Sequence, residues 1–85
     1  MMSVFSEQTI IDSIRVTEMG AIEVRRADRV LRDGLEISRN FHRHVLAPGD
    51  PLDNEDARVA AVAEAVWTPE VVQAWQDFLA SQQLT

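Results

Sequence analysis

The chain has 85 residues, no cysteine and a formal net charge of −6, since 14 acidic side chains outnumber eight arginines. This length allows one domain with a small core, because a domain of this size buries only about 60% of its unfolded surface. The acidic balance argues against a general nucleic-acid binder, and the missing cysteines exclude disulfides and thiolate zinc sites. We expect neither a membrane-spanning segment nor a secretory signal peptide, because no long apolar run occurs.

Residues 1–9 are predicted to form an N-terminal arm ahead of a single domain at residues 10–85. Apart from its methionines, the large apolar side chains of this arm are Val4 and Phe5. A short terminal arm is usually disordered unless contacts tie it down. The sequence therefore leaves two alternatives open, an arm that is held in place, for example on a neighbouring molecule, and an arm that frays.

The domain begins with a predicted three-stranded antiparallel meander at residues 10–47. Asp33-Gly34 is its clearest signal, because a two-residue type I′ turn needs positive φ at both central positions and these residue types supply it. Residues 21–32 and 35–47 flank this turn, and their alternating apolar and polar side chains are typical of strands.

A second turn joins the first strand, residues 10–17, to the second. We expect a three-residue loop at residues 18–20, with Gly20 in the left-handed conformation that such loops need. The two turns predict these cross-strand pairs: Val16 with Ile22, Ile14 with Val24, Asp12 with Arg26, Arg32 with Leu35, Val30 with Ile37, Asp28 with Arg39, Arg26 with Phe41, Val24 with Arg43, and Ile22 with Val45. One face of the sheet would then be apolar, and the other would carry Glu23, His42 and His44.

Two helices are predicted after a proline-containing loop, at residues 54–66 and 69–82. Asp53 or Asn54 suits the N-cap of the first helix, while Thr68 suits that of the second with Pro69 in its first turn. Each helix has one apolar stripe, so the pair should form a helical hairpin or corner on one face of the sheet. The expected fold class is therefore α+β, a three-stranded antiparallel β-meander followed by two short α-helices.

Two histidines and a carboxylate are the candidate metal ligands. Alternation along a strand places His42 and His44 on one face, and the predicted register sets Glu23 opposite His44. Two imidazoles and a carboxylate could bind a metal there. The alternative is a polar sheet face, half exposed or in contact with a neighbouring subunit, and no cofactor is then required.

The arginines of the two central strands form a second candidate site. Arg26, Arg39 and Arg43 are examples, and they suit an acidic partner or a phosphate-bearing ligand. The alternative is a solvated strand face with cross-strand ion pairs. Arginines beside Asp12 and Asp28 would lower the pKa of each carboxyl rather than adapt it for acid catalysis. Since no catalytic motif occurs either, we expect that the protein is not an enzyme.

The aromatic side chains allow two interpretations. Trp67 and Trp75 could anchor an interface, because tryptophan is enriched in interaction hot spots. They could instead fill a small core, which we favour for Trp75 and leave open for Trp67.

The most distinctive part of the sequence is Phe41-His42-Arg43-His44-Val45 with the Pro48-Gly49-Asp50 that follows, and it is accompanied by Trp67-Thr68-Pro69-Glu70-Val71. Together these segments resemble a family of small tailed-bacteriophage proteins, and the resemblance covers most of the chain from about Ile10. The resemblance implies a phage context rather than an activity, and it supplies no active site.

Three functions are therefore considered. The first is a structural component of a phage virion, in the tail or tail fibre, made in the host bacterial cytoplasm and present in several copies. The second is a tail-fibre assembly chaperone that is absent from the virion, and the third is a metal-dependent enzyme or metal-binding module that uses His42, His44 and Glu23. For the first we expect contacts with other phage structural proteins or with further copies of this chain, and none with nucleic acid or membrane. The predicted partner interface is Val4, Phe5, Arg26, Arg39, Phe41, His42, Arg43, His44 and Trp67.

Overall fold

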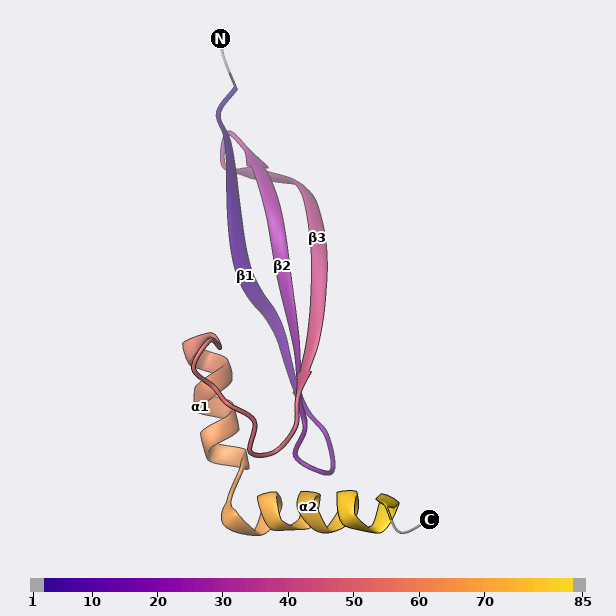
Figure 1. The fold of residues 1–85 in the computed structure, drawn as a ribbon. Coiled ribbons are helices and arrows are strands. Elements are labelled where there is room, and N and C mark those ends of the chain that lie inside the picture. The colour runs from indigo at the N-terminus through magenta and orange to yellow at the C-terminus, as the bar shows by residue number, and fades with distance from the viewer. Residues whose placement is uncertain (1–2, 84–85) are drawn as a thin grey trace.

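A computed structural model describes residues 3–83 and consists of one antiparallel sheet followed by two helices (Figure 1). The strands are β1 (Phe5–Val16), β2 (Ile22–Arg32) and β3 (Leu35–Leu46), and the helices are α1 (Ala57–Val66) and α2 (Pro69–Gln83). The strand order is β1-β2-β3, so each strand pairs with its neighbour in sequence. The predicted α+β fold, a three-stranded meander followed by two helices, is confirmed.

The molecule is elongated, with principal extents of 65 × 26 × 20 Å and a radius of gyration of 17.6 Å. A compact chain of this length would have a radius of gyration of about 12 Å. Both helices lie at one end of the sheet, and the strands continue well beyond them (Figure 1). Half of the sheet therefore projects from the molecule without a second layer.

Both predicted turns are confirmed. Asp33 and Gly34 have φ angles of 51° and 85°, as a type I′ turn requires. Gly20 has a φ of 89°, and the loop before it is closed by a hydrogen bond from the Thr17 amide to the Ala21 carbonyl at 2.9 Å. These local signals set the lengths of both hairpin loops.

The register between β1 and β2 follows the prediction only near the turn. Ile14 lies opposite Val24 as expected, but a bulge at Asp12 shifts the pairing beyond it, and Arg26 lies opposite Ile11. The predicted pairing of Asp12 with Arg26 is wrong for this reason. The bulge lets Ile11 and Ile14 both pack against the core.

The register between β2 and β3 departs from the prediction in the same way. Arg32 lies opposite Leu35 as predicted, but Ile37 forms a bulge, and every later pair is shifted by one residue. Because side chains alternate along a strand, this shift exchanges the two faces of β3. Phe41 and Val45 therefore lie on the face opposite to Ile22 and Val24, and their predicted place on the apolar face is wrong.

The core lies between α1 and the helical end of the sheet. Its buried members are Ile22, Val24, Leu46, Val59 and Ala63. Burial of each large side chain contributes about 1.5–3 kcal/mol. Helix α1 begins later than predicted, because Asp56 rather than Asp53 or Asn54 is its N-cap, and its carboxylate accepts a hydrogen bond from the Arg58 amide at 2.9 Å.

Helix α2 forms a corner with α1 and runs across the end of the sheet (Figure 1). Thr68 caps it as predicted, since its hydroxyl accepts a hydrogen bond from the Val71 amide at 3.3 Å. The indole of Trp67 donates a hydrogen bond to the Gly20 carbonyl at 2.7 Å. A Cβ on Gly20 would lie 2.6 Å from Val71 Cγ1, so the corner docks directly on the first hairpin turn.

The predicted arm is largely part of the sheet, because β1 begins at Phe5. Val4 is tied to the second hairpin turn, where its amide bonds the Asp33 carboxylate at 2.9 Å and its carbonyl accepts from the Asp33 amide at 2.8 Å. Of the two alternatives, the tied-down arm is found for residues 3–9. Residues 1 and 2 of the predicted arm, and residues 84 and 85 of the predicted domain, lie outside the described range.

Candidate interaction surface

One face of the sheet is free of helices and carries most of the arginines, and we call it the arginine face. The observed registers determine which residues belong to this face. The β2 residues that alternate with the buried Ile22 and Val24 point away from α1, and so do the residues paired with them. The charged and aromatic members of this face are Asp12, Arg15, Glu23, Arg25, Arg29, Glu36, Arg39, Phe41 and Arg43.

Two carboxylates neutralise the middle of this face. Asp12, at the β1 bulge, accepts hydrogen bonds from Arg25 Nε at 2.9 Å and Nη2 at 2.8 Å, and it lies 3.4 Å from Arg39 Nη1. Glu36 accepts from Arg39 Nη2 at 2.6 Å and lies 3.4 Å from Arg29 Nη1. The side chain of Asp12 is only 10% exposed, so water screens this network less than it would screen an exposed pair.

These ion pairs shift the titration of both partners. The hydrogen bond from Arg25 lowers the pKa of Asp12, and the hydrogen bond from Arg39 lowers the pKa of Glu36. The same bonds raise the pKa of Arg25 and of Arg39. These groups therefore keep fixed charges near neutral pH, which suits recognition of a partner rather than proton transfer.

Phe41 is covered by two guanidinium groups. Arg25 Cζ lies 4.4 Å and Arg43 Cζ 5.8 Å from the ring centroid. Arg26, which was predicted to cover this ring, lies opposite His42 because of the β3 bulge. The predicted contact between an arginine and Phe41 is thus formed, but by other arginines.

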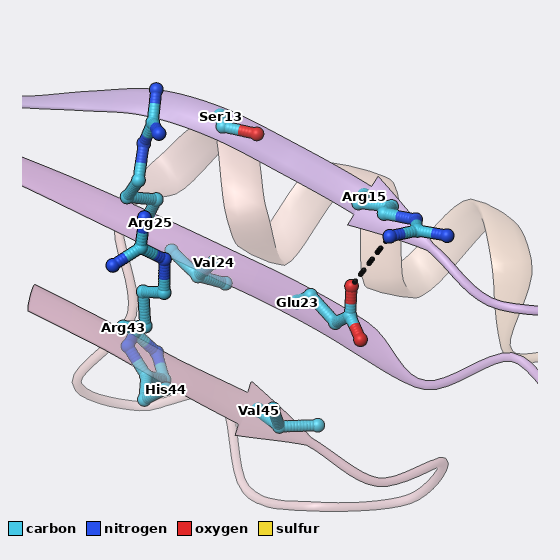
Figure 2. A pocket seen from close by; sticks show the side chains of 8 residues that line it. All are labelled: Ser13, Arg15, Glu23, Val24, Arg25, Arg43, His44 and Val45. Carbon is cyan, nitrogen blue, oxygen red and sulfur yellow. Dashed lines mark ion pairs between the residues drawn. The ribbon is translucent and has the colours of Figure 1, made fainter.

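An open pocket of about 330 Å³ lies on this face near the helical end of the sheet. Figure 2 shows Arg25 and Arg43 extending in line toward β1, with Arg15 and Glu23 on the other side of the pocket. The helices lie behind the strands in this view. Arg15 and Glu23 are 3.7 Å apart and both exposed, a geometry that contributes little to stability.

The predicted convergence of the metal-ligand candidates is wrong. Glu23 lies opposite Val45, whereas His44 lies opposite Val24 on the other face. His44 Nε2 instead lies 2.8 Å from Glu55, and His42 Nε2 lies 3.2 Å from Asp28. No cluster of three or more potential metal ligands forms within residues 3–83.

Asp28 and Arg26, together with both histidines, lie on the face that α1 covers in part. Arg26 Nη2 is 3.1 Å from the Asp28 carboxylate, which also accepts a hydrogen bond from the Thr9 hydroxyl at 3.0 Å. Burial alone would raise the pKa of Asp28, but the hydrogen bonds from Thr9 and Arg26 and the nearby positive charges together outweigh it, and the pKa is lowered. Asp28 and Asp12 are both bound by arginine, so the predicted fall in the pKa of each is confirmed.

The remaining predicted interface residues are divided between the surface and the core. Val4 and Phe5 are exposed at the tip of the sheet, 67% and 62% respectively. Trp67 packs against the core and holds the helical corner, so it is an internal anchor. Trp75, which was expected in the core, lies outside the core cluster and stacks on Phe78 with 5.5 Å between ring centroids.

The surface also exposes apolar side chains on both edge strands, on α2, just before β1 and in the first hairpin loop. They are Val4, Phe5, Val16, Met19, Leu35, Ile37, Phe41, Val45, Phe78 and Leu79. Neither edge of the sheet is paired within the described part of the chain. No helix there has the length and hydrophobicity that crossing a membrane requires.

Comparison of the chain with protein-family models, curated proteins and solved structures finds no match. The surface must therefore be interpreted from its own chemistry. The members of the arginine face that are not among the predicted interface residues are Asp12, Arg15, Glu23, Arg25, Arg29 and Glu36. The doublet Ile10-Ile11 interrupts the alternation of β1 and is the sequence signal that could have located the first bulge and hence Arg25.

Proposed function

We propose that the protein is a non-enzymatic structural component of a tailed-phage virion, in the tail or tail-fibre apparatus, and that several copies are present. The observation that carries the proposal is the projecting half of the sheet, which has two strand edges and two faces without a covering layer (Figure 1). Exposed strand edges are ready templates for pairing with another chain. A sheet that projects in this way is suited to being covered by other chains in an assembly.

Three further features support an assembly role. The extents of 65 × 26 × 20 Å give a small chain a long contact surface. The exposed apolar side chains lie along this length, from Phe5 at the tip to Leu79 on α2. Apart from Arg43, the charged groups of the arginine face are held in place by ion pairs, so that they are preorganised for a partner. The phage context itself comes from the sequence resemblance.

Quantitative mass spectrometry of density-purified phage particles tests this proposal. Several copies per particle, in a constant ratio to a major tail protein, are the expected result. The control is a host protein of similar size and abundance in the lysate, which must be depleted from the particles. A protein that is abundant in the infected lysate but depleted from particles to the same extent would refute the virion role.

The alternative function, a tail-fibre assembly chaperone that leaves before the virion is complete, is favoured by one specific observation. Residues 47–85 contain seven acidic side chains and a single arginine. This acidic part would suit transient, charge-steered binding to a basic fibre segment. Depletion from particles together with co-purification with an unassembled fibre protein would support this alternative.

A further inference from the structure

Two pairs of arginines lie directly opposite each other on the arginine face. Arg29 lies opposite Arg39, and Arg25 lies opposite Arg43. Like charges in directly opposed positions of neighbouring strands are destabilising unless a counter-charge lies between them. Each of the two pairs therefore needs a negatively charged group close to both arginines.

Within residues 3–83, only one of the two pairs has a carboxylate that contacts both of its arginines. Glu36 lies between Arg29 and Arg39, at 3.4 Å and 2.6 Å from their Nη atoms. In the other pair, Asp12 binds Arg25 at 2.8 Å. Arg43 has no ionic partner among residues 3–83, and its interaction there is with the Phe41 ring. The second pair thus lacks the carboxylate that the first pair contains.

The surroundings of Arg43 can accept such a carboxylate. The pocket beside it is about 330 Å³ in volume and is also lined by the hydroxyl-bearing Ser13 and by Arg15 and Glu23, which lie 3.7 Å apart. The Arg15 side chain is 78% exposed, and Val45, which also lines the pocket, is 62% exposed. Guanidinium groups bind carboxylates through two parallel hydrogen bonds, and Val45 offers an apolar contact beside them.

The same chain supplies the complementary charge. Residues 1–46 contain seven acidic side chains and seven arginines, so the whole net charge of −6 resides in residues 47–85. Asp53, Glu64 and Glu70 in this acidic part are exposed, and none of them forms an ion pair within the described residues. A second copy of the chain therefore offers unpaired carboxylates to Arg43, which has no carboxylate partner among residues 3–83.

We infer that the pocket around Arg43, Arg25 and Arg15 is a carboxylate-binding site that receives the acidic part, residues 47–85, of a second copy of this chain. The pocket lies on the sheet face that points away from α1 (Figure 2). The pocket and the acidic part are different surfaces, so the contact either forms twice in a two-fold dimer or repeats head to tail into a ring or a filament. The inference deepens the proposed virion role by naming another copy as a partner.

Sedimentation velocity of the purified protein tests the contact directly. We expect reversible self-association at low ionic strength that is lost near 1 M salt, where the Debye length falls to about 3 Å. Arg43→Glu should weaken the association at least about tenfold, because it places a carboxylate against the acidic part of the next copy. Arg32→Glu is the matched control, since Arg32 lies at the distant tip and bonds the Ser3 hydroxyl. Circular dichroism must show both variants folded.

A charge exchange makes the assignment specific. The triple variant Asp53→Arg, Glu64→Arg, Glu70→Arg should also lose self-association, and mixing it with Arg43→Glu should restore association between the two proteins. A wild-type protein that remains monomeric at low salt would overturn the inference, as would Arg43→Glu and Arg32→Glu proteins of equal affinity. These measurements use the isolated protein, so a negative result refutes self-association without touching the virion role, which particle mass spectrometry tests. Absence of the protein from particles would likewise refute the virion role without touching self-association.

Discussion

Gly20→Ala is the substitution that best tests how the helical corner docks on the sheet. The added Cβ would lie 2.6 Å from Val71 Cγ1, and the residue has a φ of 89°. A left-handed backbone costs an L residue about 1–2 kcal/mol, and overpacking costs about 1–3 kcal/mol more. We therefore expect the free energy of unfolding to fall by about 2–5 kcal/mol.

Gly34→Ala is the matched control for this substitution. Its φ of 85° imposes a similar backbone strain, but an added Cβ would meet nothing within 4 Å. It should cost only about 1–2 kcal/mol. Urea denaturation followed by tryptophan fluorescence measures both variants, because Trp67 bonds the Gly20 carbonyl and should change its emission when the corner separates from the turn.

Val71→Ala separates the steric contribution from the backbone strain. It removes the atom that the new Cβ would strike, so it should cost less stability in the Gly20→Ala protein than in the wild type. A coupling free energy of about 1–3 kcal/mol is expected. Equal destabilisation by Gly20→Ala and Gly34→Ala, with no coupling to Val71, would show that the corner does not pack on Gly20 as described.

Three further predictions concern single contacts. Trp67→Phe removes the hydrogen bond to Gly20 and should lower the free energy of unfolding by about 0.5–1.5 kcal/mol beyond the lost packing, with Trp75→Phe as the control. Asp12 has a lowered pKa because of Arg25, so its ion pair stabilises the fold above the unfolded pKa of about 3.9 and is lost as the pH falls through the lower folded value. Asp12→Asn should accordingly have a lower free energy of unfolding than the wild type at neutral pH, and the difference should become smaller as the pH falls. A difference in the free energy of unfolding that does not change with pH would contradict this prediction. Phe41→Leu keeps an apolar side chain but loses the ring under Arg25, and chemical denaturation should show a cost of about 0.5–1 kcal/mol.

The sequence by itself determined the elements and the turns that connect them. Asp33-Gly34 and Gly20 specify positive φ, and Thr68-Pro69 specifies a helix start, because each depends on the conformational preferences of a few adjacent residues. The kind of fold, a meander followed by two helices, follows from these signals and from the two hydrophobic periodicities. The charge asymmetry between the sheet and residues 47–85 is also a property of the sequence alone.

The positions of the two bulges do not follow from local residue preferences in the same way, because they depend on contacts between strands. At Asp12 the inserted residue lets Ile11 and Ile14 both pack on the core and places the carboxylate within reach of Arg25 and Arg39. No glycine or proline marks the bulge at Ile37, yet it exchanges the two faces of β3. Each bulge moves the pairing by a single residue, and each changes which residues form the candidate site.

Only the tertiary structure therefore decided the composition of the arginine face. Sequence pattern indicated that arginines, Phe41 and two carboxylates would lie close together on adjacent strands. It did not determine which arginine covers the ring or that Glu23 lies apart from the histidines, since alternation makes every such assignment depend on the register. Local residue preferences determine turns and caps. The registers, the two sheet faces and the lack of an ionic partner for Arg43 among residues 3–83 result instead from packing between segments that are distant in the chain.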